Sequence, residues 1–202
     1  GVMARIKMGV KKDGTITAME HILHWDAGAY VEYGANVVNA AGLSACGPYR
    51  VPNLWIDSVC VYTNLPPGGP YRGFGYSEFM FGLESHITRV AKMIGMDPVE
   101  FRRKNAIQEG DTLAYGALMN PCGMQEAIDK VAAEIEWGKK EASSDSNKAI
   151  GKGYALIWKA PAMPPNAASS AFLKFSEDGS LNITISGMEI GQGLLTVLVP
   201  AS

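Results

Sequence analysis

The segment from Pro70 to Ile94 constrains the fold of this chain more than any other. It begins with a glycine turn, Arg72-Gly73-Phe74-Gly75, in which the two glycines allow backbone conformations that other residues avoid. Apolar residues then recur at spacings of four, four, three and four, at Phe79, Leu83, Ile87, Val90 and Ile94. This spacing places them on one stripe of a helix. The sequence therefore predicts a tight turn that leads directly into an amphipathic helix.

Strand patterns precede this helix. Apolar and polar residues alternate between Val2 and Val10, and an Asp13-Gly14 turn separates them from a second alternation that begins at Ile16, which predicts a β-hairpin. A short helix is expected around Val37 to Leu43. A further strand is predicted over residues 54–63, and because both of its faces carry apolar residues, we expect it to be covered on both sides.

Two more helices are predicted after the central one. Asp97-Pro98-Val99-Glu100 combines an N-cap aspartate with a proline at the first helical position and a carboxylate in the first turn. We interpret the basic run from Arg102 to Lys104 as the solvent-exposed end of that helix, and Glu84 as a residue of a helix face or cap. The other helix covers the periodic segment from Met124 to Ile135.

The polar, aperiodic run over residues 139–149 is typical of a linker. We therefore predict two domains, residues 1–138 and 150–202. Beyond the linker, strands are predicted over Gly153–Lys159, Ala171–Phe175 and Leu181–Ser186, with a proline-constrained loop at 161–165. The fold class that follows is α+β, with mixed sheets and packed helices.

Composition excludes several classes of function. A net charge of −2 over 202 residues provides no basic field for nucleic acid, and no apolar run reaches the roughly 18 residues that span a membrane. Cys46, Cys60 and Cys122 are widely spaced, without a Cys-x-x-Cys pair, so neither a disulfide framework nor a metal site is predicted. We interpret them as buried small hydrophobes. Unpaired cysteines and ten methionines favour a reducing, cytoplasmic setting.

A second glycine turn, Gly187 to Gly193, stands between the last predicted strand and the apolar segment 194–199. Both turns are expected to present unhindered N–H groups at a helix start, where an anionic or strongly polar ligand is favoured. Neither matches the phosphate-loop or dinucleotide pattern, and no nucleophile–base pair is visible. Taken residue by residue, a salt bridge is the favoured interpretation of Arg72, and a place in the core that of Phe74.

Several segments together resemble one family, the molybdenum hydroxylases, which include xanthine dehydrogenase and aldehyde oxidoreductase. The resemblance is to the molybdopterin-binding large subunit, and it covers nearly the whole chain. Its carriers are Asp26-Ala27-Gly28-Ala29-Tyr30, Tyr49-Arg50-Val51-Pro52-Asn53, Thr63-Asn64, Tyr71 to Gly75, Glu84 to Asn105, and Gly187 to Gly193.

This resemblance implies that both glycine turns bind the molybdopterin cofactor. The first turn matches the family's contact at the molybdenum end, and Phe74 matches the phenylalanine that sandwiches an aromatic substrate. The second turn matches a contact on the dithiolene side, with Ile190 where methionine is usual. The residues assigned to cofactor binding are Arg72, Gly73, Phe74, Gly75, Ile190, Gly191, Gln192 and Gly193.

The implied reaction is hydroxylation of a carbon in an N-heterocycle or aldehyde, with water as the oxygen source. Electrons leave through iron–sulfur clusters to FAD, both in partner subunits or domains. The family's general-base glutamate is expected outside this chain, which we interpret as a fragment of the large subunit, and no residue here is expected to ligate the metal directly. Residues 39–42 lack the arginine of purine-oxidising members, which argues against a purine substrate.

A second hypothesis is that the chain is a catalytically silent or assembly domain without bound cofactor. Its missing parts would leave apolar faces exposed, which predicts self-association.

Overall fold

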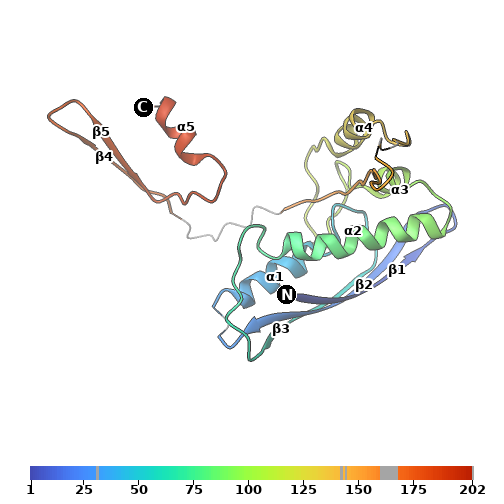
Figure 1. Ribbon diagram of the computed structural model, residues 1–202. Coiled ribbons are helices and arrows are strands. Elements are labelled where there is room, and N and C mark those ends of the chain that lie inside the picture. The colour runs from blue at the N-terminus through green and yellow to red at the C-terminus, as the bar shows by residue number, and fades with distance from the viewer. Residues whose placement is uncertain (31, 142, 144, 160–167, 202) are drawn as a thin grey trace. The chain divides into compact units, whose positions relative to one another are not determined.

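The computed structural model describes residues 1–30, 32–141, 143, 145–159 and 168–201 (Figure 1). The chain divides into two compact units, Gly1–Ala160 and Pro161–Ser202. The first unit contains a three-stranded sheet in the order β1-β2-β3, and its strands are β1 (Val2–Val10), β2 (Ile16–Gly28) and β3 (Leu54–Tyr62). The predicted hairpin is confirmed, because β1 and β2 pair antiparallel, and β3 joins β2 in parallel. The α+β class is therefore correct.

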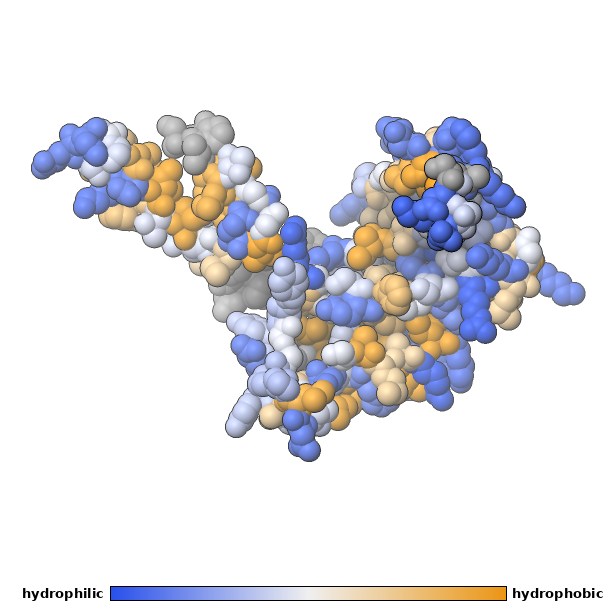
Figure 2. All heavy atoms as spheres, in the orientation of Figure 1, coloured by the Kyte–Doolittle hydropathy of each residue, from blue (hydrophilic) through white to orange (hydrophobic). Residues whose placement is uncertain are grey.

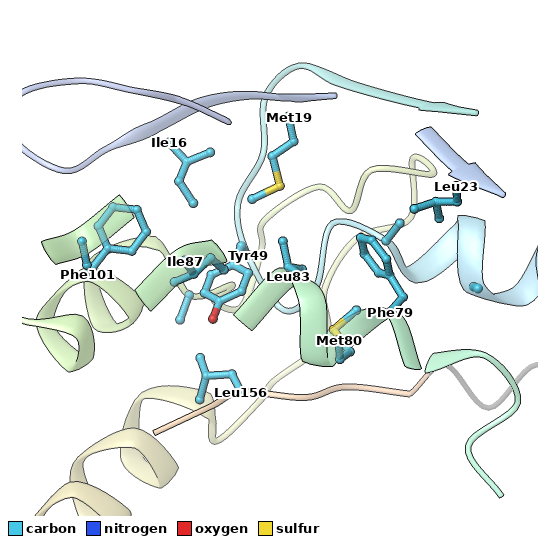
Figure 3. Close-up of a cluster of buried hydrophobic side chains, with 14 of the residues drawn as sticks. Ile16, Met19, Leu23, Tyr49, Phe79, Met80, Leu83, Ile87, Phe101 and Leu156 are labelled. Atoms are coloured by element: carbon cyan, nitrogen blue, oxygen red, sulfur yellow. The ribbon is translucent and has the colours of Figure 1, made fainter. Parts of the chain in front are cut away.

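Helices α1 (Gly34–Ser44) and α2 (Tyr76–Met93) cover one face of this sheet (Figure 1). The predicted apolar stripe of α2 is confirmed for Phe79, Leu83 and Ile87, which are at most 1% exposed. Val90 is half-buried, and Ile94 lies just beyond the helix and is 37% exposed. Figure 3 shows the three buried side chains facing side chains of β2, among them Met19 and Leu23. Burying each such side chain contributes about 1.5–3 kcal/mol, so the stripe fixes α2 on the sheet.

The two predicted helices that follow are also present, as α3 (Pro98–Asn105) and α4 (Met124–Glu134). Asp97 caps α3, because its Oδ1 accepts hydrogen bonds from the N–H groups of Val99 and Glu100 at 2.8 and 3.1 Å. The interpretation of the basic run as a solvated helix end is wrong for Arg102, which is fully buried. Val99, Arg102 and Asn105 recur every three residues on the inward face of α3, and this face packs against α2.

Arg102 is buried together with Glu84, which the sequence had placed on a helix face or cap. The Arg102 Nε donates to Glu84 Oε2 at 2.8 Å, and its Nη2 donates to Thr88 Oγ1 at 2.9 Å. The other carboxylate oxygen, Oε1, accepts from the Tyr49 hydroxyl, and Oε2 also accepts from the Leu156 N–H at 2.9 Å. One buried ion pair therefore joins α2, α3, the segment before β3 and the segment after α4.

The strand predicted over Gly153–Lys159 is wrong, because the structure assigns no strand to these residues. Leu156 instead packs into the core of the first unit and bonds to a side chain of α2 (Figure 3). Trp158 donates through Nε1 to the Ser44 carbonyl at 3.1 Å. The segment thus belongs to the first compact unit, whereas the predicted linker at 139–149 and the division into two cofactor-binding domains stay predictions.

The expectation that the third strand is covered on both sides is also wrong for the described residues. β3 is an edge strand, and α1 packs against it. Alternate residues of β3 point away from the helices, and Trp55 and Val59 are 65% and 45% exposed. Apolar residues on both faces of a strand indicate burial only when a second layer is present, and this chain has none in the described part.

The second unit consists of the hairpin β4 (Ala171–Phe175) and β5 (Leu181–Ile185), followed by α5 (Leu194–Ala201). Both predicted strands are confirmed, and the predicted proline loop at 161–165 lies outside the described residues. Figure 2 shows hydrophobic residues on the surface of this unit. Phe172 and Phe175 of β4 are 65% and 75% exposed. No helix of the described residues is long and apolar enough to cross a membrane.

The loop that leads to the first glycine turn is held against the end of β2. Asp26 Oδ1 accepts from Thr63 Oγ1 at 2.6 Å and from the Gly28 N–H at 2.9 Å, and these bonds, the first above all, lower the pKa of Asp26. Gly28 has a φ of +74°, and a Cβ added there would lie 2.3 Å from the Pro66 carbonyl oxygen. The small residues of the 26–30 segment therefore allow two stretches of backbone to meet.

We expect Gly28→Ala to destabilise the chain strongly. Alanine in a left-handed conformation costs about 1–2 kcal/mol, and the clash with Pro66 adds to this cost. Gly95→Ala is the matched control, because Gly95 has a φ of +72° but no atom within 4 Å of the added Cβ. Urea unfolding of both variants measures the difference; equal losses of unfolding free energy would contradict the close approach at Gly28.

His21 gives a second prediction, which concerns pH. It lies within β2, fully buried against the Phe79 ring, and neither ring nitrogen has a hydrogen-bond partner among the described residues. Burial, aided by His86, lowers the pKa of His21 from 6.5 to about 4. As the pH falls from 6.5 to 4, the unfolded chain binds a proton that the folded chain resists. His21 should therefore cost up to about 3 kcal/mol of stability across this interval.

This contribution is measured by denaturant unfolding at pH 7 and pH 4.5. His21→Leu should lose less stability on acidification than the parent chain. His24→Leu, on the exposed face of the same strand, should keep the parental pH dependence. The same loss in parent and His21→Leu would show that His21 does not resist protonation.

Candidate functional site

The first glycine turn has three successive residues with positive φ. The values are +114° at Gly73, +57° at Phe74 and +87° at Gly75. Glycine adopts this region without strain, but a residue such as Phe74 does so at a cost of order 1–3 kcal/mol. Such conformations persist where the surroundings impose them, and they cluster at ligand sites. The turn is therefore a stronger candidate for a binding segment than its sequence alone indicates.

Packing and one backbone hydrogen bond hold this turn in place. Gly75 is the N-cap residue of α2, and a Cβ added to it would lie 2.9 Å from the Val37 carbonyl oxygen of α1. A Cβ added to Gly73 would lie 2.4 Å from Ser77 Oγ. The Tyr76 N–H donates to the Gly73 carbonyl at 3.2 Å and closes the turn. Gly75 is thus required by its contact with the backbone of α1, and Gly73 by its φ of +114°, which other residues rarely adopt.

The turn also leaves the start of α2 without a side-chain cap in the described structure. Gly73 and Phe74 are half-buried, and Arg72 is exposed beside them. The helix dipole places partial positive charge at this end. A cationic side chain, a half-buried aromatic ring and a helix N-terminus therefore occur together within four consecutive residues, and together they suit a polar or anionic ligand with a planar ring.

The second turn has a different construction. Gly191 and Gly193 have φ values of +95° and +82°. The Glu189 Oε1 accepts from the N–H groups of both glycines, at 2.6 and 3.3 Å, and its Oε2 accepts from the Leu195 N–H at 3.4 Å. The expectation that this turn presents unhindered N–H groups to a ligand is therefore wrong for these three donors, because a carboxylate of the chain already binds them.

Gln192 is also used within the second turn. Its Nε2 donates to the Met188 carbonyl at 2.7 Å, and its Oε1 accepts from the Ile190 N–H at 2.7 Å. The sequence predicts a cofactor contact for Gln192 and indicates no role for Glu189. An acidic residue just before a predicted helix start is the pattern that could have indicated a carboxylate at these N–H groups.

The two predicted binding turns belong to different compact units, Arg72–Gly75 to the first and Ile190–Gly193 to the second. The interpretation of Cys46 as a buried small hydrophobe is confirmed, and burial raises the pKa of its thiol to about 12. Cys60 and Cys122 are half-buried. In the described part of the chain, no three His, Cys, Asp or Glu side chains gather into a group that could hold a metal ion.

Two parts of the chain match known domains. Residues 1–106 and residues 130–200 each match a family described as "Molybdopterin cofactor-binding domain". The chain is 33% identical over 198 residues to the xanthine dehydrogenase molybdenum-binding subunit of Escherichia coli O157:H7, with 95% of this chain and 26% of that protein covered. It is 32% identical over 193 residues to the aldehyde oxidoreductase of Megalodesulfovibrio gigas, with 93% and 21% covered.

A solved structure agrees with these relatives. The aldehyde oxidoreductase from Desulfovibrio desulfuricans is similar with a TM-score of 0.75 at 26% identity, over 90% of this chain and 20% of that one. The chain thus spans about a quarter of the length of the curated relatives it matches. On this evidence, the chain belongs to the molybdopterin cofactor-binding domain family.

Proposed function

We propose that the chain is part of the large subunit of a molybdenum hydroxylase and contributes two segments to the molybdopterin site. The observation that carries this proposal is the Arg72–Gly75 turn, with its three left-handed residues at the uncapped start of α2. The names of the relatives, a xanthine dehydrogenase subunit and an aldehyde oxidoreductase, support the same class of enzyme.

The residues of the first turn fit a large polar cofactor. Gly73 and Gly75 bring the backbone close to both helices, and a side chain at either position would disrupt the turn. Arg72 and the start of α2 provide positive charge, while the Phe74 ring forms one wall of a substrate pocket. When it is bound, the molybdopterin cofactor provides the chemistry that hydroxylates a substrate carbon with oxygen from water. The chain's own residues hold the cofactor and orient an N-heterocycle or aldehyde beside it.

The second turn fits the cofactor through its open side. A Cβ added to Gly193 would meet no atom within 4 Å, so a ligand can approach the backbone there. Ile190, Gly191, Gln192 and Gly193 form this second contact in our proposal. In this proposal, residues 1–138 form the end of one molybdopterin-binding domain, and residues 150–202 form the start of the next. Residues 139–149 are the linker between the two domains.

The rest of the enzyme lies in other segments and subunits. We place the general-base glutamate in the remainder of the large subunit, and the iron–sulfur clusters and FAD in partner subunits or domains. Exposed Phe172 and Phe175 support self-association of the chain when it is separated from those parts. Three free cysteines are compatible with a cytoplasmic location.

Cofactor content tests this function directly. The intact enzyme, purified with its partner subunits, should contain about one molybdenum and one pterin per large subunit. Metal analysis and pterin fluorescence after denaturation measure both. A fully folded, correctly assembled enzyme without molybdenum and pterin would contradict the proposal and support the silent domain.

The substitution Phe74→Ala tests whether the Phe74 ring forms a wall of the substrate pocket. Because a stacked aromatic pair contributes about 0.5–1.5 kcal/mol beyond its buried area, the variant should lower kcat/KM for an aromatic substrate by about twofold to tenfold. Its molybdenum content should stay at the parental level. Phe81→Ala is the control, since Phe81 lies further along α2 and is 79% exposed. If kcat/KM in Phe74→Ala equals that of the parent, Phe74 does not line the substrate pocket.

A further inference from the structure

The Glu189 carboxylate is bound by the backbone of the second glycine turn. It accepts hydrogen bonds from the Gly191, Gly193 and Leu195 N–H groups. The first donor, at 2.6 Å, is two residues away, and the last belongs to the first turn of α5. One side chain therefore binds the donors at a helix start where an external anion would otherwise bind.

Gln192 completes this arrangement from the other side. Its side-chain amide bonds to the Met188 carbonyl and the Ile190 N–H, both before the glycines. Glu189 fixes the N–H groups that follow it, and Gln192 fixes the backbone that precedes it. The glycines have little conformational preference of their own. The shape of the turn is consequently set by two side chains.

We propose that Glu189 is a positioning residue, whose carboxylate holds the Gly191–Leu195 backbone in the shape that meets the cofactor. The inference rests on the proposed function of this turn. Three N–H donors and the positive end of α5 favour a negative charge at this point. Partial desolvation opposes that charge, but the hydrogen bonds from Gly191, Gly193 and Leu195 outweigh it and lower the pKa of Glu189. The side chain is therefore ionised near neutral pH.

This proposal predicts what the loss of the carboxylate does. Without it, the three donors must turn to water and the glycines regain their conformational freedom. The turn would then occupy its bound shape for a smaller fraction of time, and the affinity for the cofactor would fall by that fraction. Glu189 acts through the backbone, so a side chain that still accepts two of the three bonds should retain part of the effect.

The test uses the intact enzyme with the substitutions Glu189→Ala and Glu189→Gln. Glu177→Gln, in the β4–β5 turn of the same unit, is the matched control. In Glu189→Ala, the amides of Gly191, Gly193 and Leu195 should exchange with solvent about fivefold to tenfold faster, which corresponds to the loss of one hydrogen bond each. The molybdenum content should fall severalfold. The exchange rates and the molybdenum content of Glu189→Gln should lie between those of the parent and those of Glu189→Ala, because the Oε1 atom of the introduced amide can still accept from the two glycines.

Two readouts separate the possible failures. Parental molybdenum content in Glu189→Ala overturns the proposal, whether or not the amides exchange faster, because the turn then needs no positioning for the cofactor. Unchanged exchange in that variant also overturns it, since the carboxylate would not hold the backbone. If the parent enzyme itself contains no molybdenum, the proposed function has failed, and amide exchange still tests whether Glu189 shapes the turn.

Discussion

The buried ion pair between Glu84 and Arg102 is the interaction on which the first unit depends. Removing two charges from water is costly, and one partner left alone typically destabilises a protein by about 3–5 kcal/mol. Here the cost is offset because the donors and acceptors of the pair are satisfied by neighbours, among them the Tyr49 hydroxyl and the Leu156 N–H. Burial, and then the Glu84 carboxylate, raise the pKa of Tyr49, which keeps its proton as a donor.

This ion pair fixes the middle of α2, while the first glycine turn fixes its start. Gly75 brings the turn against α1, and the loop before it is held to β2 by the contact between Gly28 and Pro66. A helix held at two points cannot shift without breaking one of them. The left-handed Phe74 is therefore maintained by packing that lies outside the turn itself.

The sequence predicted what depends on local spacing. The stripe of α2, the Asp97 cap and both hairpins follow from periodicity and turn chemistry, and all are present. It missed what depends on a neighbour distant in the chain. A charged residue in a basic run gives no sign that it is buried, yet Arg102 meets a carboxylate eighteen residues away. Likewise, residues 153–159 have the pattern of a strand, but their hydrogen bonds go to residues of the helices α1, α2 and α4.

The candidate site shows the same division. Both glycine turns could be found from sequence, because glycine at a helix start is a local pattern. How each turn is stabilised could not, since the first depends on contact with α1 and the second on the Glu189 and Gln192 side chains. Substitutions should therefore act differently in the two turns. In the first, added volume disrupts packing, whereas in the second, loss of a polar side chain releases a backbone that has little shape of its own.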